Sequence, residues 1–147
     1  MSLREKLLED FKIAMREKDT VRKDAVQMVR SAVLQIEKDK RVTLDDDGII
    51  EVIAKQIKQR KDVLPEYEKS GRQELIEQLK KEIEILLKYL PEQLTEEELE
   101  AIINEIIQDT GAQSMKDIGK VMQTVMPKVR GRADSKLVNQ IVRKLLV

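Results

Sequence analysis

Apolar side chains recur every three or four residues along most of the chain, which is the period of a helix with one buried face. In the N-terminal half this pattern predicts four helices. They cover about residues 3–18, from 19 or 20 to the polar stretch 38–43, 45–70 and 72–88. Good helix formers dominate, and the alternating β-branched and aromatic residues typical of strands are scarce. We therefore expect an all-α fold whose first four helices form an antiparallel bundle or a pair of helical hairpins.

Capping residues and prolines indicate where these helices begin and end. Ser2 and Glu5 form the pattern of a capping box at the first helix. Asp45 begins a run of carboxylates that favours the positive end of a helix dipole, so the third helix is expected to open there. Pro65 lacks an amide donor and clashes with the preceding turn, which predicts a kink or a short break in that helix.

A boundary between two domains is predicted at residues 89–95. Pro91 pushes the residue before it out of helical space, and Thr95 starts a second capping box. Three further helices are expected at about residues 96–109, 114–126 and 135–146, the second of them ending before Pro127. The sequence thus predicts an N-terminal helical domain at residues 1–90 and a small three-helix domain at residues 95–147.

The composition removes several kinds of chemistry. The chain has no cysteine and no histidine, which excludes thiol nucleophiles, disulfides, histidine bases and the usual His/Cys zinc sites. No glycine-rich phosphate loop or Gly-x-Ser-x-Gly elbow occurs, and Asp45–Gly48 lacks the alternating ligands of a calcium loop, so it is expected to cap a helix. We expect no catalytic residue, no cofactor and no metal site. The missing cysteines fit a cytoplasmic location, and no apolar run is long enough to span a membrane.

Charge is balanced over the whole chain but not along it. The 28 Lys and Arg residues match 28 Asp and Glu residues, so the formal net charge is zero. Residues 95–109 carry six acids and no base, whereas residues 110–147 carry eight bases and two acids, a net charge of +6. Such a local patch can attract a polyanion even in a neutral protein. The simpler alternative is a solvated face, or one that pairs with the acidic helix beside it.

The predicted turn at residues 127–134 favours anion binding. Lys128, Arg130 and Arg132 alternate with small residues there, and Gly131 permits backbone conformations that bring amides near a phosphate. The N-terminus of the next helix also attracts anions, unless Asp134 occupies it as a cap.

Gly119 lies inside the sixth predicted helix, beside Lys116 and Lys120. Glycine in a helix costs about 1 kcal/mol relative to alanine, so its presence indicates close packing of a neighbouring helix or close approach by a ligand. Base stacking is poorly supplied, because the chain has only three aromatic residues, Phe11, Tyr67 and Tyr89. Contacts with a nucleic acid would therefore involve its backbone and shape.

Two blocks of residues carry a family resemblance. The C-terminal block consists of Gly119–Met122, Pro127–Asp134 and Leu137–Asn139, and the N-terminal block of Gln59–Asp62, Tyr67, Gly71–Arg72 and Tyr89–Leu94. Together they resemble YqeY-type proteins of the GatB/YqeY family over essentially the whole chain. The resemblance implies a two-part helical protein related to the tail of the GatB subunit of the Asp/Glu-tRNA amidotransferase. That tail is a helical module that contacts the tRNA body, while the chemistry lies elsewhere.

Individual positions follow the resemblance unevenly. Five residues match the short glycine-centred signature of that tail: Gly119, Lys120, Gly131, Ala133 and Asp134. Ser135 stands where the tail often has proline, and Gln27 where the family often has arginine. The first departure leaves the entry to the last helix less fixed, and the second gives position 27 no family role.

These observations predict a non-catalytic module that binds tRNA. We expect its interface at Lys116, Gly119, Lys120, Lys128, Arg130, Gly131, Arg132 and Lys136. Two alternatives stay open. One is a helical adaptor whose first four helices offer a groove to a protein partner. The other is an accessory component of an amidotransferase complex, for which carbon–nitrogen ligase activity with glutamine as amide donor is implied by kinship only.

Overall fold

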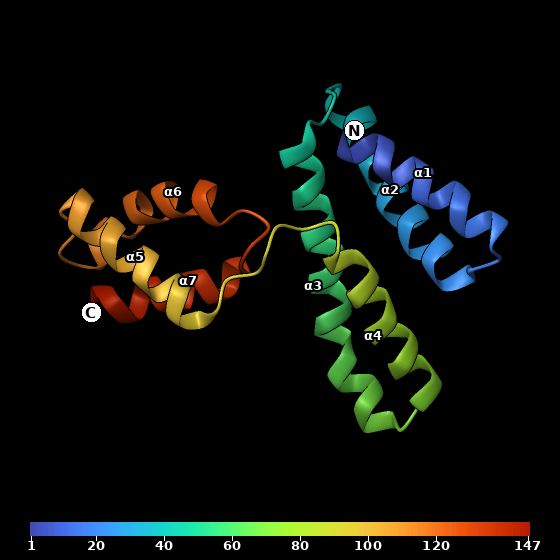
Figure 1. The fold of residues 1–147 in the computed structure, drawn as a ribbon. Helices are drawn as coiled ribbons and strands as arrows, with labels where there is room; N and C mark the ends of the chain where they lie inside the picture. Colours follow the sequence, from blue (N-terminus) through green and yellow to red (C-terminus); the bar gives the residue numbers. More distant parts are fainter. The chain divides into compact units, whose positions relative to one another are not determined.

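The computed structural model of the protein describes residues 1–147 and contains seven α-helices, one short 3₁₀ turn and no β-strand (Figure 1). This confirms the all-α fold that the sequence predicts. The helices are α1 (Leu3–Arg16), α2 (Thr20–Lys40), α3 (Asp46–Ser70), α4 (Gln73–Leu87), α5 (Glu96–Thr110), α6 (Ile118–Val129) and α7 (Ser135–Leu146), and the 3₁₀ turn η1 (Met115–Asp117) precedes α6. None of these helices combines the length and the apolar character that crossing a membrane requires. The chain divides into two compact units, residues 1–90 and residues 91–147.

Two helical hairpins, α1–α2 and α3–α4, build the first unit (Figure 1). Their central helix is α2, because it packs against α1, α3 and α4. The face that α2 buries consists of four small or β-branched residues, each 3% exposed or less: Ala25, Val26, Val29 and Val33. The remaining buried members of this core come from the other three helices: Leu7, Ile49, Val52, Ile53, Ile57, Ile83 and Leu86.

The ends of the first helices are set by the expected capping residues. The hydroxyl of Ser2 accepts a hydrogen bond from the amide of Glu5 at 3.2 Å, and the Glu5 carboxylate accepts one from the Ser2 amide, which confirms the capping box. α1 ends at Arg16, two residues earlier than predicted, because Lys18 adopts a left-handed conformation with φ of 57°. Asp45 caps α3 by accepting from the amide of Gly48 at 2.9 Å, as predicted.

Pro65 does not interrupt α3, which continues through it to Ser70 without the short break expected from the sequence. The hydrogen bond that proline cannot make would end on the carbonyl of Lys61, one turn earlier. Both residues are exposed, so water can solvate that carbonyl. The penalty that proline imposes on a buried helix is therefore reduced here.

The second unit packs α5, α6 and α7 around a core of its own. Ten buried residues form it: Leu99, Ile103, Ile106, Val121, Val125, Val129, Val138, Ile141, Val142 and Leu146. The capping box at Thr95 forms as predicted, with its hydroxyl accepting from the amide of Glu98 at 3.1 Å. The predicted end of the sixth helix before Pro127 is wrong, because α6 includes this proline in its last turn and ends at Val129. Ser114 caps the short turn η1 rather than α6 itself.

Candidate nucleic-acid interface

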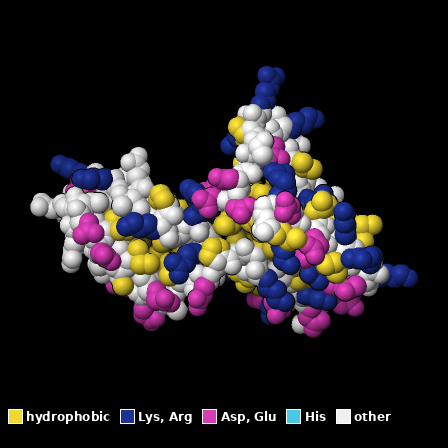
Figure 2. Space-filling model, turned by 45° about the horizontal axis from the view of Figure 1, so that its top comes forward, with side chains coloured by type: hydrophobic (Ala, Val, Ile, Leu, Met, Phe, Trp, Pro, Cys, Tyr) yellow, Lys and Arg dark blue, Asp and Glu magenta, His cyan; other side chains and the backbone are white.

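The C-terminal unit contains a long stretch that is almost free of acids. From Ile118 to Val147 the chain carries seven Lys and Arg residues and a single acid, Asp134. On the face drawn in Figure 2, basic and acidic side chains are intermingled over both units, so the excess of positive charge belongs to this stretch and not to the whole surface.

The outward face of α6 concentrates part of this charge. Val121, Val125 and Val129 are fully buried, which turns the opposite side of the helix toward solvent. That side presents no acid and consists of exposed residues at helical spacing: Gly119, Lys120, Gln123, Pro127 and Lys128. Two of the predicted interface cations therefore share one solvent-facing stripe.

Lys128 and Lys136, on either side of the α6–α7 turn, are exposed, and no hydrogen bond or ion pair engages their ammonium groups. The Lys120 ammonium donates one hydrogen bond to the carbonyl of Thr110 at 3.1 Å. No ion pair joins the acids of α5 to the two free lysines, so the predicted alternative of neutralisation by that helix does not hold for them. Both ammonium groups are therefore available to an anion.

Asp117 is the acid nearest to the predicted lysines at the start of α6. Its carboxylate accepts a hydrogen bond from the amide of Gln113 at 3.0 Å, and this bond, helped by the charges of Lys120 and Lys116, lowers its pKa. Asp117 therefore stays ionised near neutral pH and offsets part of the positive charge at this end of the stripe. The end at Lys128 has no such neighbour on α6.

Gly119 is not explained by close packing. A β-carbon built at this position would meet no atom within 4 Å, so no neighbouring helix requires glycine there. Of the two expectations from the sequence, packing is thus wrong for this structure. The glycine leaves a patch of bare backbone on the stripe beside Lys120.

The turn between α6 and α7 is built around a left-handed glycine and fastened to the segment that leads into α5. Gly131 has φ of 72°, a conformation that side chains with a β-carbon rarely adopt. Its carbonyl accepts a hydrogen bond from the side-chain amide of Gln93 at 2.6 Å. The carbonyl of Arg132 accepts from the amide of Leu94 at 2.9 Å, and the Arg132 side chain donates to the carbonyl of Glu92 at 3.0 Å.

We call these three hydrogen bonds, between residues 92–94 and residues 131–132, the strap. The strap fixes Arg132 as a structural element of the turn, although the sequence predicted it as a cation for the ligand. Arg130, the third predicted cation, is half-buried. Sequence reasoning missed the strap because a hydrogen bond between residues 38 positions apart leaves no local pattern.

Asp134 takes the cap of α7. Its carboxylate accepts from the amide of Lys136 at 3.0 Å, so a side chain of the protein occupies the position where an anion would bind the helix N-terminus. This outcome agrees with the cap alternative and disfavours the helix end as a phosphate site. An anion at this turn would be held by side chains instead.

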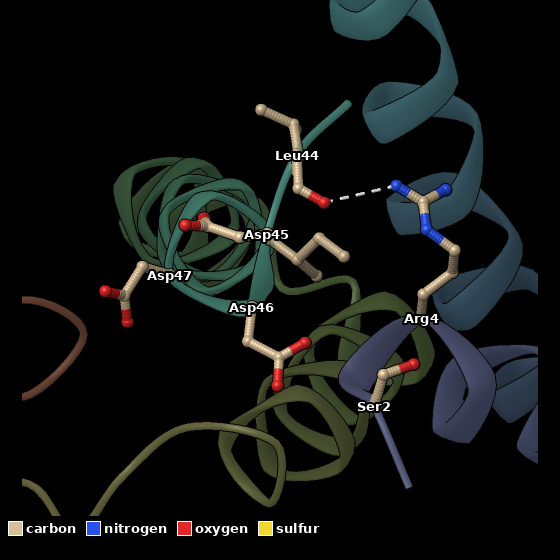
Figure 3. A pocket seen from close by; sticks show the side chains of 7 residues that line it. Ser2, Arg4, Leu44, Asp45, Asp46 and Asp47 are labelled. Atoms are coloured by element: carbon tan, nitrogen blue, oxygen red, sulfur yellow. Dashed lines mark hydrogen bonds between the residues drawn. The ribbon is translucent and has the colours of Figure 1, made fainter. Parts of the chain in front are cut away.

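The acidic segment at the start of α3 forms a shallow pocket but serves a structural role (Figure 3). The carboxylate of Asp46 accepts from the amide of Leu3 at 3.1 Å, and the Arg4 side chain donates to the carbonyl of Leu44 at 3.3 Å. No group of three acidic, histidine or cysteine side chains in the structure is placed to hold a metal ion. These contacts join the beginnings of α1 and α3.

Comparison with known proteins places the chain among relatives. A family model described as Yqey-like protein matches residues 4–146. The Altered inheritance of mitochondria protein 41, mitochondrial, of Kluyveromyces lactis is 38% identical over 107 residues, which cover 70% of this chain and 57% of the relative. Its counterpart in Pyrenophora tritici-repentis is 24% identical over 144 residues, covering 96% of this chain and 79% of the relative. The chain thus spans little more than half the length of the Kluyveromyces protein.

A component of an amidotransferase matches a shorter segment. This protein, one subunit of the Glutamyl-tRNA(Gln) amidotransferase of Thermococcus gammatolerans, is 46% identical over 55 residues, which cover 35% of this chain and 9% of the relative. The amidotransferase kinship expected from the sequence is thus met through the Thermococcus protein.

The relatives' names contradict the cytoplasmic location predicted above. Five of them are named as mitochondrial proteins, which points to mitochondria instead. The prediction rested on the absence of cysteine, which indicates only that the fold needs no disulfide and does not distinguish one reducing compartment from another. The family is settled by the match over residues 4–146, and the chain belongs to the Yqey-like proteins.

Proposed function

We propose that the C-terminal unit, residues 91–147, binds tRNA through its phosphate backbone. The observation that carries this proposal is the acid-poor surface of α6, α7 and their turn, where Lys128 and Lys136 are exposed and have no partner within the protein. Cations presented in this way are the usual contacts of proteins that neutralise phosphates. The strap supports the same role, because it holds the turn between the two lysines in one conformation.

The proposed contacts are with phosphates and not with bases. All three aromatic residues of the chain precede residue 91, so the C-terminal unit has no ring on which a base could stack. Its exposed lysines act as point charges, and they suit a folded polyanion whose backbone passes over the stripe. Bare backbone at Gly119 lets that polyanion come close to α6.

The relatives support tRNA as the polyanion. The Thermococcus relative is named for its action on Glutamyl-tRNA(Gln), and it shares 46% identity with a 55-residue segment of this chain. We assign no catalytic residue and no cofactor to the chain, so its role is that of a binding module. Acting as an accessory component of an amidotransferase would require stable co-purification with the catalytic subunits of such an enzyme.

The test is the salt dependence of tRNA affinity in a filter-binding assay. Each phosphate contact adds about 0.7–0.9 to the slope of log affinity against log salt, so Lys128→Ala/Lys136→Ala should flatten the slope by up to about 1.5 and weaken binding at low salt. The matched control is Lys61→Ala/Lys69→Ala, which removes the same charge from exposed positions on α3. Equal effects of the two double variants, or no effect of either, would contradict the proposal.

A further inference from the structure

A second cavity lies within the N-terminal unit, far along the chain from the proposed tRNA surface. It has a volume of about 410 Å³ and is enclosed by residues of α1, α2 and α4 and of the connections next to them. This volume is at the lower end of the range, roughly 300–1,000 Å³, typical of small-molecule sites. Its lining is mostly charged: Lys6, Asp10, Asp19, Arg22, Lys81, Glu84, Ile85, Lys88 and Tyr89.

The deepest charged group of this cavity is Asp10, which is 3% exposed. One of its carboxylate oxygens lies 3.3 Å from the Lys6 ammonium and 3.6 Å from the Arg22 guanidinium. The other accepts a hydrogen bond from the Tyr89 hydroxyl. Burial, together with this neighbouring carboxylate, raises the pKa of Tyr89, so the phenol stays protonated and keeps donating. Asp10 is therefore neutralised by groups of the protein and does not repel an anion as a free carboxylate would.

Hydrogen-bond donors outnumber acceptors among the groups that remain. Asp19 already accepts from the amide of Arg22 at 3.2 Å as the cap of α2. The Lys6 and Arg22 side chains are 53% and 31% exposed, and each has N–H groups beyond those that reach Asp10.

The wall that α4 contributes has the same excess of donors. Lys81 and Lys88 have no hydrogen bond or ion pair, and Glu84 between them is the one acid of this wall. Their spacing of seven residues puts both lysines on the same side of α4, about two turns apart. The cavity thus offers several ammonium and guanidinium donors and a single uncommitted carboxylate.

We propose that this cavity binds a small phosphate ester that also has free hydroxyl groups, such as a mononucleotide or a sugar phosphate. Its phosphate oxygens, which only accept, take hydrogen bonds from Lys81, Lys88 and Arg22. A neighbouring hydroxyl donates to Glu84, which explains an acid among the lysines. The walls contributed by three helices leave room for a small molecule but not for a nucleic-acid helix. The site therefore does not depend on the proposed tRNA surface.

The test is a titration of the full chain, followed by ¹H–¹⁵N NMR, with AMP, adenosine and ribose 5-phosphate as separate probes. Both phosphate esters should shift the amides of α1, α2 and α4 in a saturable manner, and adenosine should not. Loss of one charge-assisted contact in Lys81→Ala should weaken AMP binding about tenfold. The matched control is Lys80→Ala, on the next residue of the same helix, which is exposed and does not line the cavity. It should change AMP affinity less than twofold.

Several outcomes would overturn the proposal. They are shifts that do not saturate, equal shifts with adenosine, and equal effects of the Lys80 and Lys81 variants. A titration with tRNA is the remaining arm, since shifts of these amides with tRNA but not with AMP would make the cavity a contact of the nucleic-acid backbone. Glu84→Gln separates the hydroxyl from the phosphate, because it should weaken ribose 5-phosphate while leaving inorganic phosphate unaffected. The spectrum of each variant shows directly that it is folded.

Discussion

Removing the strap's side chain provides a test that separates the shape of the α6–α7 turn from its charge. The change is Gln93→Ala, which deletes the hydrogen bond to the carbonyl of Gly131 at 2.6 Å and a second one to the carbonyl of Pro91 at 3.0 Å. No charge is lost. The two backbone carbonyls are exposed and can bind water instead, so the free energy of unfolding should fall by no more than about 1 kcal/mol.

The expected effect on tRNA binding follows from the freedom that the turn regains. Fixing the backbone of one residue opposes binding by about 1 kcal/mol, so a turn that must be ordered again on binding should lower affinity about fivefold. The slope of affinity against salt should stay that of the wild type, because every cation is still present. Amide hydrogen exchange at residues 131–133 should become faster.

Filter binding over a range of salt concentrations, together with hydrogen exchange, measures these quantities. The control is Gln78→Ala, which truncates an exposed glutamine of α4. A changed salt slope, or unchanged exchange at the turn together with weaker binding, would refute the reasoning, because the effect would then not arise from loss of order.

Three further substitutions test other parts of the structure. Glu82→Ala leaves the buried guanidinium of Arg60 without its carboxylate at 3.3 Å, so the free energy of unfolding in urea should fall by about 3 kcal/mol, whereas replacing both residues by apolar ones should be far less damaging. Gly119→Ala adds a methyl group in open space; it should raise stability by up to about 1 kcal/mol and still weaken tRNA binding measured on filters. The side chain of Arg4 and the amide of Leu44 lower the pKa of Glu37 below 4.5, so its stabilising effect is present above that pH and lost as the pH falls through the folded pKa. Glu37→Gln should therefore be less stable than the wild type at neutral pH, and the difference should shrink in urea titrations below pH 4.5.

The helices and their caps were predictable because they depend on local patterns. Ser2, Asp45 and Thr95 cap the helices that the sequence assigned to them, since capping involves residues three positions apart. The prolines were harder, because their effect depends on exposure. Pro65 and Pro127 both lie inside helices on exposed positions, where the unpaired carbonyl one turn earlier can be solvated.

The candidate site was predictable in charge but not in geometry. Counting charges located the basic stretch, yet only the structure separates the free Lys128 and Lys136 from Arg132, whose side chain holds the turn to Glu92. Asp10 and Tyr89 are 79 positions apart, and nothing in the spacing of either residue indicates that they meet in a cavity. Contacts of this kind depend on how helices pack, which the apolar period alone does not determine.

Lysine footprinting on the tRNA-bound protein tests the central claim most directly, because it reports where the polyanion lies. The rate of acetylation of each exposed lysine is measured by mass spectrometry with and without tRNA. We predict that tRNA protects Lys128 and Lys136 and leaves Lys61 and Lys69 as reactive as in the free protein. Protection confined to lysines before residue 91, with Lys128 and Lys136 unaffected, would contradict the account.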